Sequence, residues 1–436
     1  MNSVSSVSST ASSAASSWNR ARWIIWGAFA LVLLAAPHIF TAGFALTLMC
    51  QIGTFMIFAL SFNMLLGQSG MLSFGHAVYA GLGAYFAIHL LNMIGKGSLF
   101  PVSLLPLVGG VAGAVFGVLF GYVTTKKSGT PFAMITLGIG ELVFAMSLMF
   151  PAFFGGEGGV SSNRIAGESL FGFFTSVTFG PQIQVYYLVA VWLFVCTAAM
   201  YAFTHTPLGR IANAVRDNPE RVEFIGYETQ RVRYLVLIIS GFFAGVSGGL
   251  AAINFEIVSS ENVSAIRSGS VLLFTFIGGV PFFFGPMIGA VIFGLFIVVL
   301  STITKAWLLY LGLFFVLMVM YCPGGIATLI MMQVPLIKAG RFKEIAPSYA
   351  LALAAGALLL AALIFAVEMI YHLSLEAASG TSKVIFGMQV DVASAPPWIG
   401  VVLLTAAGAV LFFHARRGVM LHWDRIMGDI IKGQTS

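Results

Sequence analysis

Long apolar runs dominate this sequence and constrain its fold more than any other feature. Ten of them approach or exceed the ~20 residues that a helix needs to cross a bilayer. Only 8% of the residues are charged, whereas a water-soluble domain carries about 25%. The surface must therefore face lipid, and the sequence predicts an all-α, polytopic transmembrane helical bundle. The predicted crossings are 23–41, 43–66, 74–94, 102–123, 131–153, 183–203, 234–258, 306–322, 349–372 and 397–414.

A further apolar run, 270–301, is interrupted at its centre by "GGVPFFFGP" (278–286). Positive charge collects on the cytoplasmic side of membrane proteins, and it indicates how this run lies. If the N-terminus is cytoplasmic and the run enters and leaves by one face, 16 of the 21 Lys and Arg residues fall inside. A single crossing would place later basic segments outside. The sequence therefore predicts a broken re-entrant hairpin at 270–301 and cytoplasmic N- and C-termini.

The predicted domain organisation has three parts. Residues 1–22, rich in Ser and Ala, are expected to be a disordered cytoplasmic tail. Residues 23–344 are expected to form a transmembrane domain, and 345–436 a C-terminal extension with two of the predicted crossings, whose role the sequence does not indicate. Two runs of glycine at four-residue spacing predict close helix packing. They are Gly109, Gly113, Gly117 and Gly121, and Gly241, Gly245 and Gly249.

The sequence offers little chemistry of its own. It has no G-x-x-x-x-G-K-[ST] motif and therefore no P-loop for ATP. Its three cysteines lie far apart without metal-ligand spacing. We therefore predict no catalytic residue, no metal and no cofactor bound by this chain, and no enzymatic activity. The net charge of +6 comes without a long basic run, which excludes a nucleic-acid-binding tail.

One inner segment is typical of a docking element. The stretch 205–233 is the longest basic connection between predicted crossings. It is predicted to form two short helices around Asn218-Pro219, ending at Gly226. Because the chain lacks an ATP-binding motif, we expect this segment to receive motion from a cytoplasmic ATPase, with 205–227 as its coupling part.

Six motifs, in order, resemble a known family. They are "ALSFNMLLGQSGMLSFGHAVYAGLGAYFA" (59–87), "GTPFAMITLGIGELV" (129–143), "FGGEGGV" (154–160), "TPLGRIANAVRDNPERVEFIGY" (206–227), "GGVPFFFGPMIGA" (278–290) and "YCPGGI" (321–326). Together they resemble the larger permease subunit of high-affinity branched-chain amino acid ABC transporters, over about residues 40–330. The break near 280 departs from the family, which usually has Gly-Thr-Leu after the glycine pair, whereas here Val280–Phe284 follows.

The resemblance implies a bacterial inner-membrane subunit in a multi-subunit importer. Expected partners are a homologous second permease, two cytoplasmic ATPases that bind ATP, a periplasmic substrate-binding protein and the lipid bilayer. The family's coupling segment falls on 206–227. The residues then expected to face the ATPase are Arg210, Asp217, Asn218, Glu220, Glu223 and Gly226.

The polar break at 67–73 is the candidate substrate path. Its glycines permit unwound backbone, and a helix beginning near Ser73 would present free N–H groups suited to a carboxylate. A tight turn whose glycines serve geometry alone fits the same residues. Glu141 is expected either to line a wet cavity or to pair across helices. The candidate path residues are Asn63, Gln68, Ser69, Ser73, His76, Thr136 and Glu141.

These observations predict an ABC permease subunit that carries branched-chain or other hydrophobic amino acids. One alternative keeps the architecture and changes the cargo to urea or short amides. Another, from a different class, is an ion-coupled secondary transporter, but Glu141 alone gives weak support to a relay of buried carboxylates or histidines. The exact cargo and the stoichiometry do not follow from the sequence.

Overall fold

A computed structural model describes residues 23–95, 100–166, 178–375, 382–385 and 387–435. It confirms the all-α, polytopic bundle: within these ranges nine helices are long and apolar enough to cross a membrane, or ten with a bent helix pair. The contacts divide the chain into two compact units, Met1–Val298 with Leu317–Ala327 and Val299–Val316 with Thr328–Ser436. The expected tail at 1–22 lies outside the described residues, and the domain limits drawn from the sequence remain a proposal.

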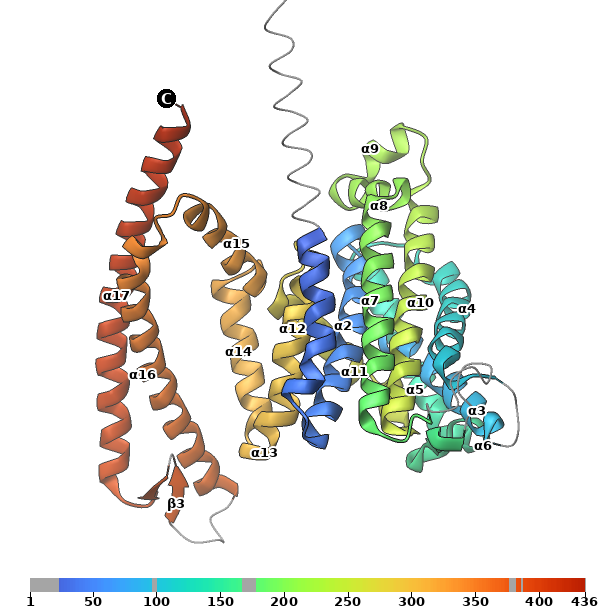
Figure 1. Ribbon diagram of the computed structural model, residues 1–436, viewed down its shortest axis with the longest axis horizontal. Helices are drawn as coiled ribbons and strands as arrows, with labels where there is room; N and C mark the ends of the chain where they lie inside the picture. Colours follow the sequence, from blue (N-terminus) through green and yellow to red (C-terminus); the bar gives the residue numbers. More distant parts are fainter. Residues whose placement is uncertain (1–22, 96–99, 167–177, 376–381, 386, 436) are drawn as a thin grey trace, which may run out of the picture. The chain divides into compact units, whose positions relative to one another are not determined.

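The first unit is a helical bundle with α10 at its core, since 78% of the most apolar window of this helix is buried. The short helices α8 and α9 lie at one end of the bundle and α6 lies at the other (Figure 1). An apolar helix, Trp23–Ile39, comes first. It is followed by α2 (Gly43–Ser69), α3 (Ala77–Ile94), α4 (Leu105–Thr124), α5 (Thr130–Met149), α6 (Pro151–Phe154), α7 (Gln182–His205), α8 (Pro207–Asp217), α9 (Pro219–Phe224), α10 (Thr229–Phe255), α11 (Ala265–Gly278) and α12 (Gly285–Gly294).

Short elements close the loops of this unit at the end of the bundle opposite α8 and α9. Strand β1 (Val160–Ser161) pairs antiparallel with β2 (Ile257–Val258). The 3-10 turns are η1 (Val102–Leu104), η2 (Gly156–Gly158), η3 (Arg164–Ala166) and η5 (Ser260–Val263).

Glycine faces bring α4 and α10 into backbone contact, as the four-residue spacing predicted. A Cβ added to Gly109, Gly113 or Gly245 would lie within 3.0 Å of backbone atoms of the opposite helix. Gly83 of α3 meets both helices at the same place, because its Cβ would lie 2.7 Å from the Gly109 carbonyl oxygen and from the Gly245 Cα. A side chain on any of them would push the core helices apart.

The interrupted run at 270–301 folds as two helices that reverse direction at the predicted break. The first, α11, has 14 residues and is too short to cross a bilayer alone, whereas Gly285–Ile303, which begins with α12, has 19. Helix α12 continues through the π-helical turn η6 (Leu295–Leu300) into α13 (Ser301–Ile303). Small residues allow the reversal, since a Cβ on Gly278 would lie 2.8 Å from the Gly289 amide nitrogen.

The second unit contains a long helix pair beyond the family motifs. Helices α14 (Trp307–Tyr321) and α15 (Gly325–Lys338) precede α16 (Phe342–Leu375) and α17 (Ala395–Thr435), and α16 packs against α17. An antiparallel hairpin, β3 (Ser382–Ile385) and β4 (Met388–Asp391), connects α16 to α17. The crossing predicted at 397–414 is part of a helix that continues to Thr435, because membrane length limits an apolar run but not a polar helix beyond it.

Candidate functional site

The polar break between α2 and α3 is the first element of the candidate site. Helix α2 ends at Ser69, and Gly70 takes the left-handed conformation (φ +70°) that closes it. Its amide donates to the Leu66 carbonyl at 3.0 Å. Helix α3 begins at Ala77, four residues after the expected start near Ser73. The break therefore spans 70–76.

Amide groups in and beside the break are bonded within the fold. The Ala77 amide donates to Ser268 Oγ of α11 at 3.0 Å. The Phe74 amide donates to Thr136 Oγ1 of α5 at 3.2 Å. In this conformation the start of α3 is tied to α5 and α11. Thr136, one of the path candidates, therefore lies against the break.

Four further path candidates lie buried around this break. His76 is 1% exposed, and Ser61 Oγ lies 3.0 Å from its Nε2. Aromatic rings of Phe58, Phe62 and Tyr79 surround the imidazole, with ring centroids 5.3–5.9 Å away. The other three are Asn63, Ser69 and Ser73, each at most 3% exposed.

Three of these buried side chains carry a polar atom without a hydrogen-bond partner among the described residues. The atoms are Asn63 Oδ1, Ser73 Oγ and His76 Nδ1. Gly67 leaves the space that Asn63 occupies, since a Cβ at Gly67 would lie 2.5 Å from Asn63 Oδ1. Ser69 Oγ, in contrast, donates to the Leu65 carbonyl at 2.7 Å. Free acceptors next to a broken helix are suited to a water or a passing polar solute.

Glu141 lies apart from this cluster, on an exposed face of α5. It is eleven residues past Thr130, about 16 Å along the helix. Met134, Gly138 and Ala145 are exposed on the same face at helical spacing. The Glu141 side chain therefore points away from the interior of this chain, near the middle of α5.

The expected coupling segment forms α8 and α9, each begun by a side-chain cap. Thr206 Oγ1 accepts from the Gly209 amide at 3.2 Å, and Asn218 Oδ1 accepts from the Arg221 amide at 3.0 Å. Gly226, after α9, has φ +92°. All six residues expected to face an ATPase are exposed: Arg210, Asp217, Asn218, Glu220, Glu223 and Gly226. The apolar tip beside them is also exposed, with Phe224 at 89% and Ile225 at 73%.

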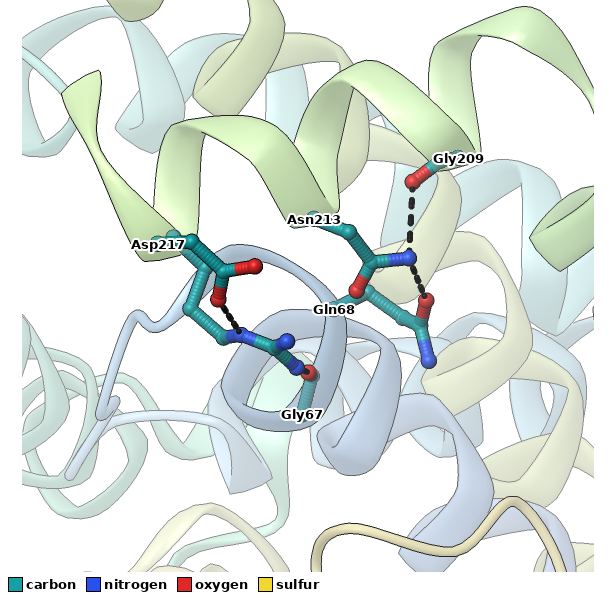
Figure 2. Close-up of polar contacts among 6 residues, drawn as sticks. Gly67, Gln68, Gly209, Asn213 and Asp217 are labelled. Atoms are coloured by element: carbon teal, nitrogen blue, oxygen red, sulfur yellow. Dashed lines mark hydrogen bonds and ion pairs between the residues drawn. The ribbon is translucent and has the colours of Figure 1, made fainter. Parts of the chain in front are cut away.

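Hydrogen bonds join α8 directly to the end of α2 (Figure 2). Asn213 Nδ2 donates to Gln68 Oε1 at 2.8 Å, and the same nitrogen donates to the Gly209 carbonyl at 3.2 Å. Arg216 Nη1 donates to the Gly67 carbonyl, and its Nε pairs with Asp217 at 2.9 Å. We name these contacts the α8–α2 joint. Gln68, predicted as a path residue, is thus bonded to the coupling segment.

Sequence reasoning missed Asn213 and Arg216 as functional residues. The hydrogen bonds from them to α2 bridge 145 and 149 residues of chain. Both residues lie within the segment that the sequence marked as the coupling segment. No local pattern in the sequence, however, indicated that they bind α2.

A buried arginine organises the opposite end of the bundle. Arg164 is 9% exposed and donates from Nη1 to the Ile253 and Asn254 carbonyls, the last turn of α10. Its Nη2 donates to the Gly180 carbonyl and to Gln182 Oε1, at 3.3 and 3.0 Å. A cation at a helix C-terminus is favoured by the helix dipole. Arg164 thereby holds its own loop against the last turn of α10 and the start of α7.

The described residues include no group of three or more His, Cys, Asp or Glu side chains that could hold a metal ion. The candidate site consists of a broken helix, the α8–α2 joint and the expected coupling segment.

Comparisons with known proteins agree with this geometry. A family described as "Branched-chain amino acid transport system / permease component" matches residues 44–322. The high-affinity branched-chain amino acid transport system permease protein LivM of Salmonella typhimurium is 28% identical over 66% of this chain and 71% of its own length. LivM of Escherichia coli is 27% identical over 62% of this chain and 67% of its own length. The fructose import permease protein FrcC of Rhizobium meliloti is 26% identical over 45% and 55%. No solved structure matches the chain.

Proposed function

Because this chain belongs to the family of branched-chain amino acid transport system permease components, we propose that it forms the translocation path of an ABC importer for these amino acids. It is a multi-pass membrane protein, and we place it in the bacterial inner membrane with both termini cytoplasmic. The chain itself supplies the path and binds no cofactor. ATP is bound and hydrolysed in separate subunits.

The observation that carries the proposal is the α8–α2 joint. It connects an exposed, charged pair of short helices to Gly67 and Gln68 in the last turn of α2, directly before the polar break. A displacement of α8 would pull on Gln68 and Gly67 at the base of the break. The buried side chains of the break would then be rearranged without any chemistry in this chain.

Two cytoplasmic ATPases are the proposed source of that displacement. The exposed face of α8 and α9 combines charges with an apolar tip, Phe224 and Ile225. Exposed apolar residues bordered by polar ones are typical of an interaction surface. We assign the contact to Arg210, Asp217, Asn218, Glu220, Glu223 and Gly226.

A second permease is the proposed cover for the exposed face of α5. A carboxylate at mid-helix is costly against lipid, and Glu141 lies about 16 Å along this helix. If a homologous subunit packs there, Glu141 faces a shared interior. The path then lies between two permeases and includes Glu141 together with the break residues Asn63, Ser69, Ser73, His76 and Thr136.

A periplasmic substrate-binding protein is proposed to deliver cargo to the opposite end. The loops held there by Arg164, with β1 and β2, form a surface braced by hydrogen bonds to α7 and α10. Because the binding protein selects the cargo first, this chain need only accept an amino acid with an aliphatic side chain.

Uptake by the complete transporter in proteoliposomes tests the proposal. With the receptor loaded with leucine outside and ATP inside, we expect leucine to accumulate, and we expect no accumulation without the ATPases. Accumulation driven by an ion gradient in their absence would instead identify a secondary transporter. Transport of urea or acetamide without transport of leucine would contradict the cargo.

A further inference from the structure

A small cavity lies within the first unit, apart from the α8–α2 joint. Its walls come from α2, α3, α10, the β2–η5 segment and α11. Its volume is about 30 Å³, and ~10–15 Å³ suffices for one water molecule. The cavity therefore has room for about two waters, a space comparable with one carboxylate group.

Small and apolar side chains make up most of this cavity wall. A hydrocarbon group can pack against such a wall without leaving a polar group unpaired. Besides Gly81 and Gly248, the wall residues buried to at least 91% are Phe58, Ala80, Ala84, Ser247, Ala252 and Val258. The hydroxyl of Ser247 is already used, since it donates to the Thr54 carbonyl at 2.8 Å.

Arg267 is the one cationic side chain in the wall. Its guanidinium lies over the ring of Phe55, 4.9 Å from the ring centroid. Phe55 is 1% exposed and lies twelve residues after Gly43, about 18 Å along α2. The arginine thus reaches deep into the bundle, where an ionisable group is costly and usually functional.

The guanidinium of Arg267 has no hydrogen-bond acceptor or ion-pair partner among the residues that the structure describes. The carboxylate that influences its charge is that of Glu261 on η5, which interacts with the guanidinium electrostatically but forms no ion pair with it. A guanidinium has five N–H donors suited to a carboxylate. Asn262, the neighbouring wall residue, adds a side-chain amide that is likewise unbonded within the described ranges.

The cavity is linked to the polar break through two of its neighbours. Ser268, next to Arg267, accepts from the Ala77 amide at the start of α3, at 3.0 Å. Phe58, a wall residue, stacks on His76 with ring centroids 5.5 Å apart. Any movement of the break therefore changes the shape of the cavity.

We propose that this cavity is the carboxylate subsite of the translocation path, and this rests on the proposed function. The guanidinium of Arg267 binds the cargo carboxylate, and the wall at Ala80, Ala84 and Val258 receives the adjoining hydrocarbon. A whole amino acid is larger than the cavity. Its passage requires α3 and α10 to separate beside Gly81 and Gly248, two further wall residues.

Two variants in the complete transporter test the subsite. With the receptor saturated with leucine, Arg267→Gln should lower the uptake rate by about tenfold, as expected for a lost charged hydrogen bond. Receptor-stimulated ATP hydrolysis should stay within about twofold, because the α8–α2 joint is intact. Arg267→Lys keeps the charge without the two-pronged geometry and should give an intermediate rate.

A binding readout separates recognition from structure. Millimolar leucine should raise the thermal midpoint of the wild-type complex, whereas leucinamide, which lacks the carboxylate, should not. Arg267→Gln should abolish the leucine effect. The matched control is Arg417→Gln, which removes another Arg-on-Phe contact, 5.6 Å from the Phe413 centroid, and should leave uptake and the leucine effect unchanged.

Three results would overturn the subsite. The first is an uptake rate of Arg267→Gln equal to that of the wild type, and the second is a shift of the thermal midpoint by leucinamide equal to that by leucine. The third is a parallel loss of uptake, ATP hydrolysis and thermal midpoint in Arg267→Gln, which would show that the arginine has a structural role alone. If wild-type transporter with active ATPases imports no leucine, the proposed function fails instead. The leucine and leucinamide shifts then still decide whether the cavity recognises a carboxylate.

Discussion

Replacing Gly245 by alanine tests the packing of the bundle core. A Cβ on Gly245 would lie 2.8 Å from the Gly109 carbonyl carbon and 3.1 Å from the Gly110 Cα. These are backbone atoms and cannot rotate away, so α4 and α10 must separate. Overpacking of this kind costs ~1–3 kcal/mol, and the helical preference of alanine over glycine returns ~0.5–1 kcal/mol. We therefore expect a net loss of about 0.5–2 kcal/mol.

The matched control is Gly356→Ala in α16, where an added Cβ meets nothing within 4 Å. It should be neutral or stabilise the protein by up to ~1 kcal/mol. Unfolding of each variant in mixed detergent–SDS micelles, followed by circular dichroism, gives the free-energy difference. If Gly245→Ala is as stable as Gly356→Ala relative to wild type, the backbone contact of α4 and α10 does not limit stability and the packing argument is refuted.

Three further substitutions probe single polar contacts, each measured by the same SDS unfolding. Arg164→Met removes the donors to Ile253, Asn254 and Gln182 and should cost ~1.5–3 kcal/mol; a loss under ~0.5 kcal/mol would show that other contacts hold the loop around Arg164. Ser61→Ala leaves His76 Nε2 without its hydroxyl partner and should cost ~1–3 kcal/mol, with Ser270→Ala on exposed α11 surface as a near-neutral control. Glu368→Gln removes the 2.8 Å ion pair with Lys383 and weakens the acceptor shared by Thr304 and Tyr310. The free energy of unfolding should therefore fall by ~3–5 kcal/mol. A variant as stable as the wild type would contradict a structural role for this cluster.

The membrane helices could be predicted because a bilayer imposes a length and a composition on each crossing. The break after Ser69 could also be placed, since Gly70 and its polar neighbours stop an apolar helix. The glycine spacing of α4 and α10 predicted close packing of these helices, because small residues four positions apart lie on one helix face. These features are local in sequence.

Contacts that join distant segments were beyond sequence reasoning. Gln68 was assigned to the path, and its hydrogen bond to Asn213 depends on how α8 folds back across α2. The position of Arg267 over the Phe55 ring likewise depends on how α11 packs against α2. Glu368 is 9% exposed and is paired with Lys383, a contact that depends on the β3–β4 hairpin folding back onto α16. Counting charges indicates on which side of the membrane a loop lies. It does not indicate how deep a charged side chain reaches or which face of its helix it occupies.

The transport yield per ATP, measured in a double-mutant cycle across the α8–α2 joint, tests whether this joint transmits the movement of α8 to α2. Asn213→Ala and Gln68→Ala each remove one end of the 2.8 Å hydrogen bond. If this bond transmits the movement of α8, each single variant imports less leucine per ATP hydrolysed while the ATPases remain bound, and the double variant is no worse than either. A wild-type yield in both single variants, or losses that simply multiply in the double variant, would contradict it.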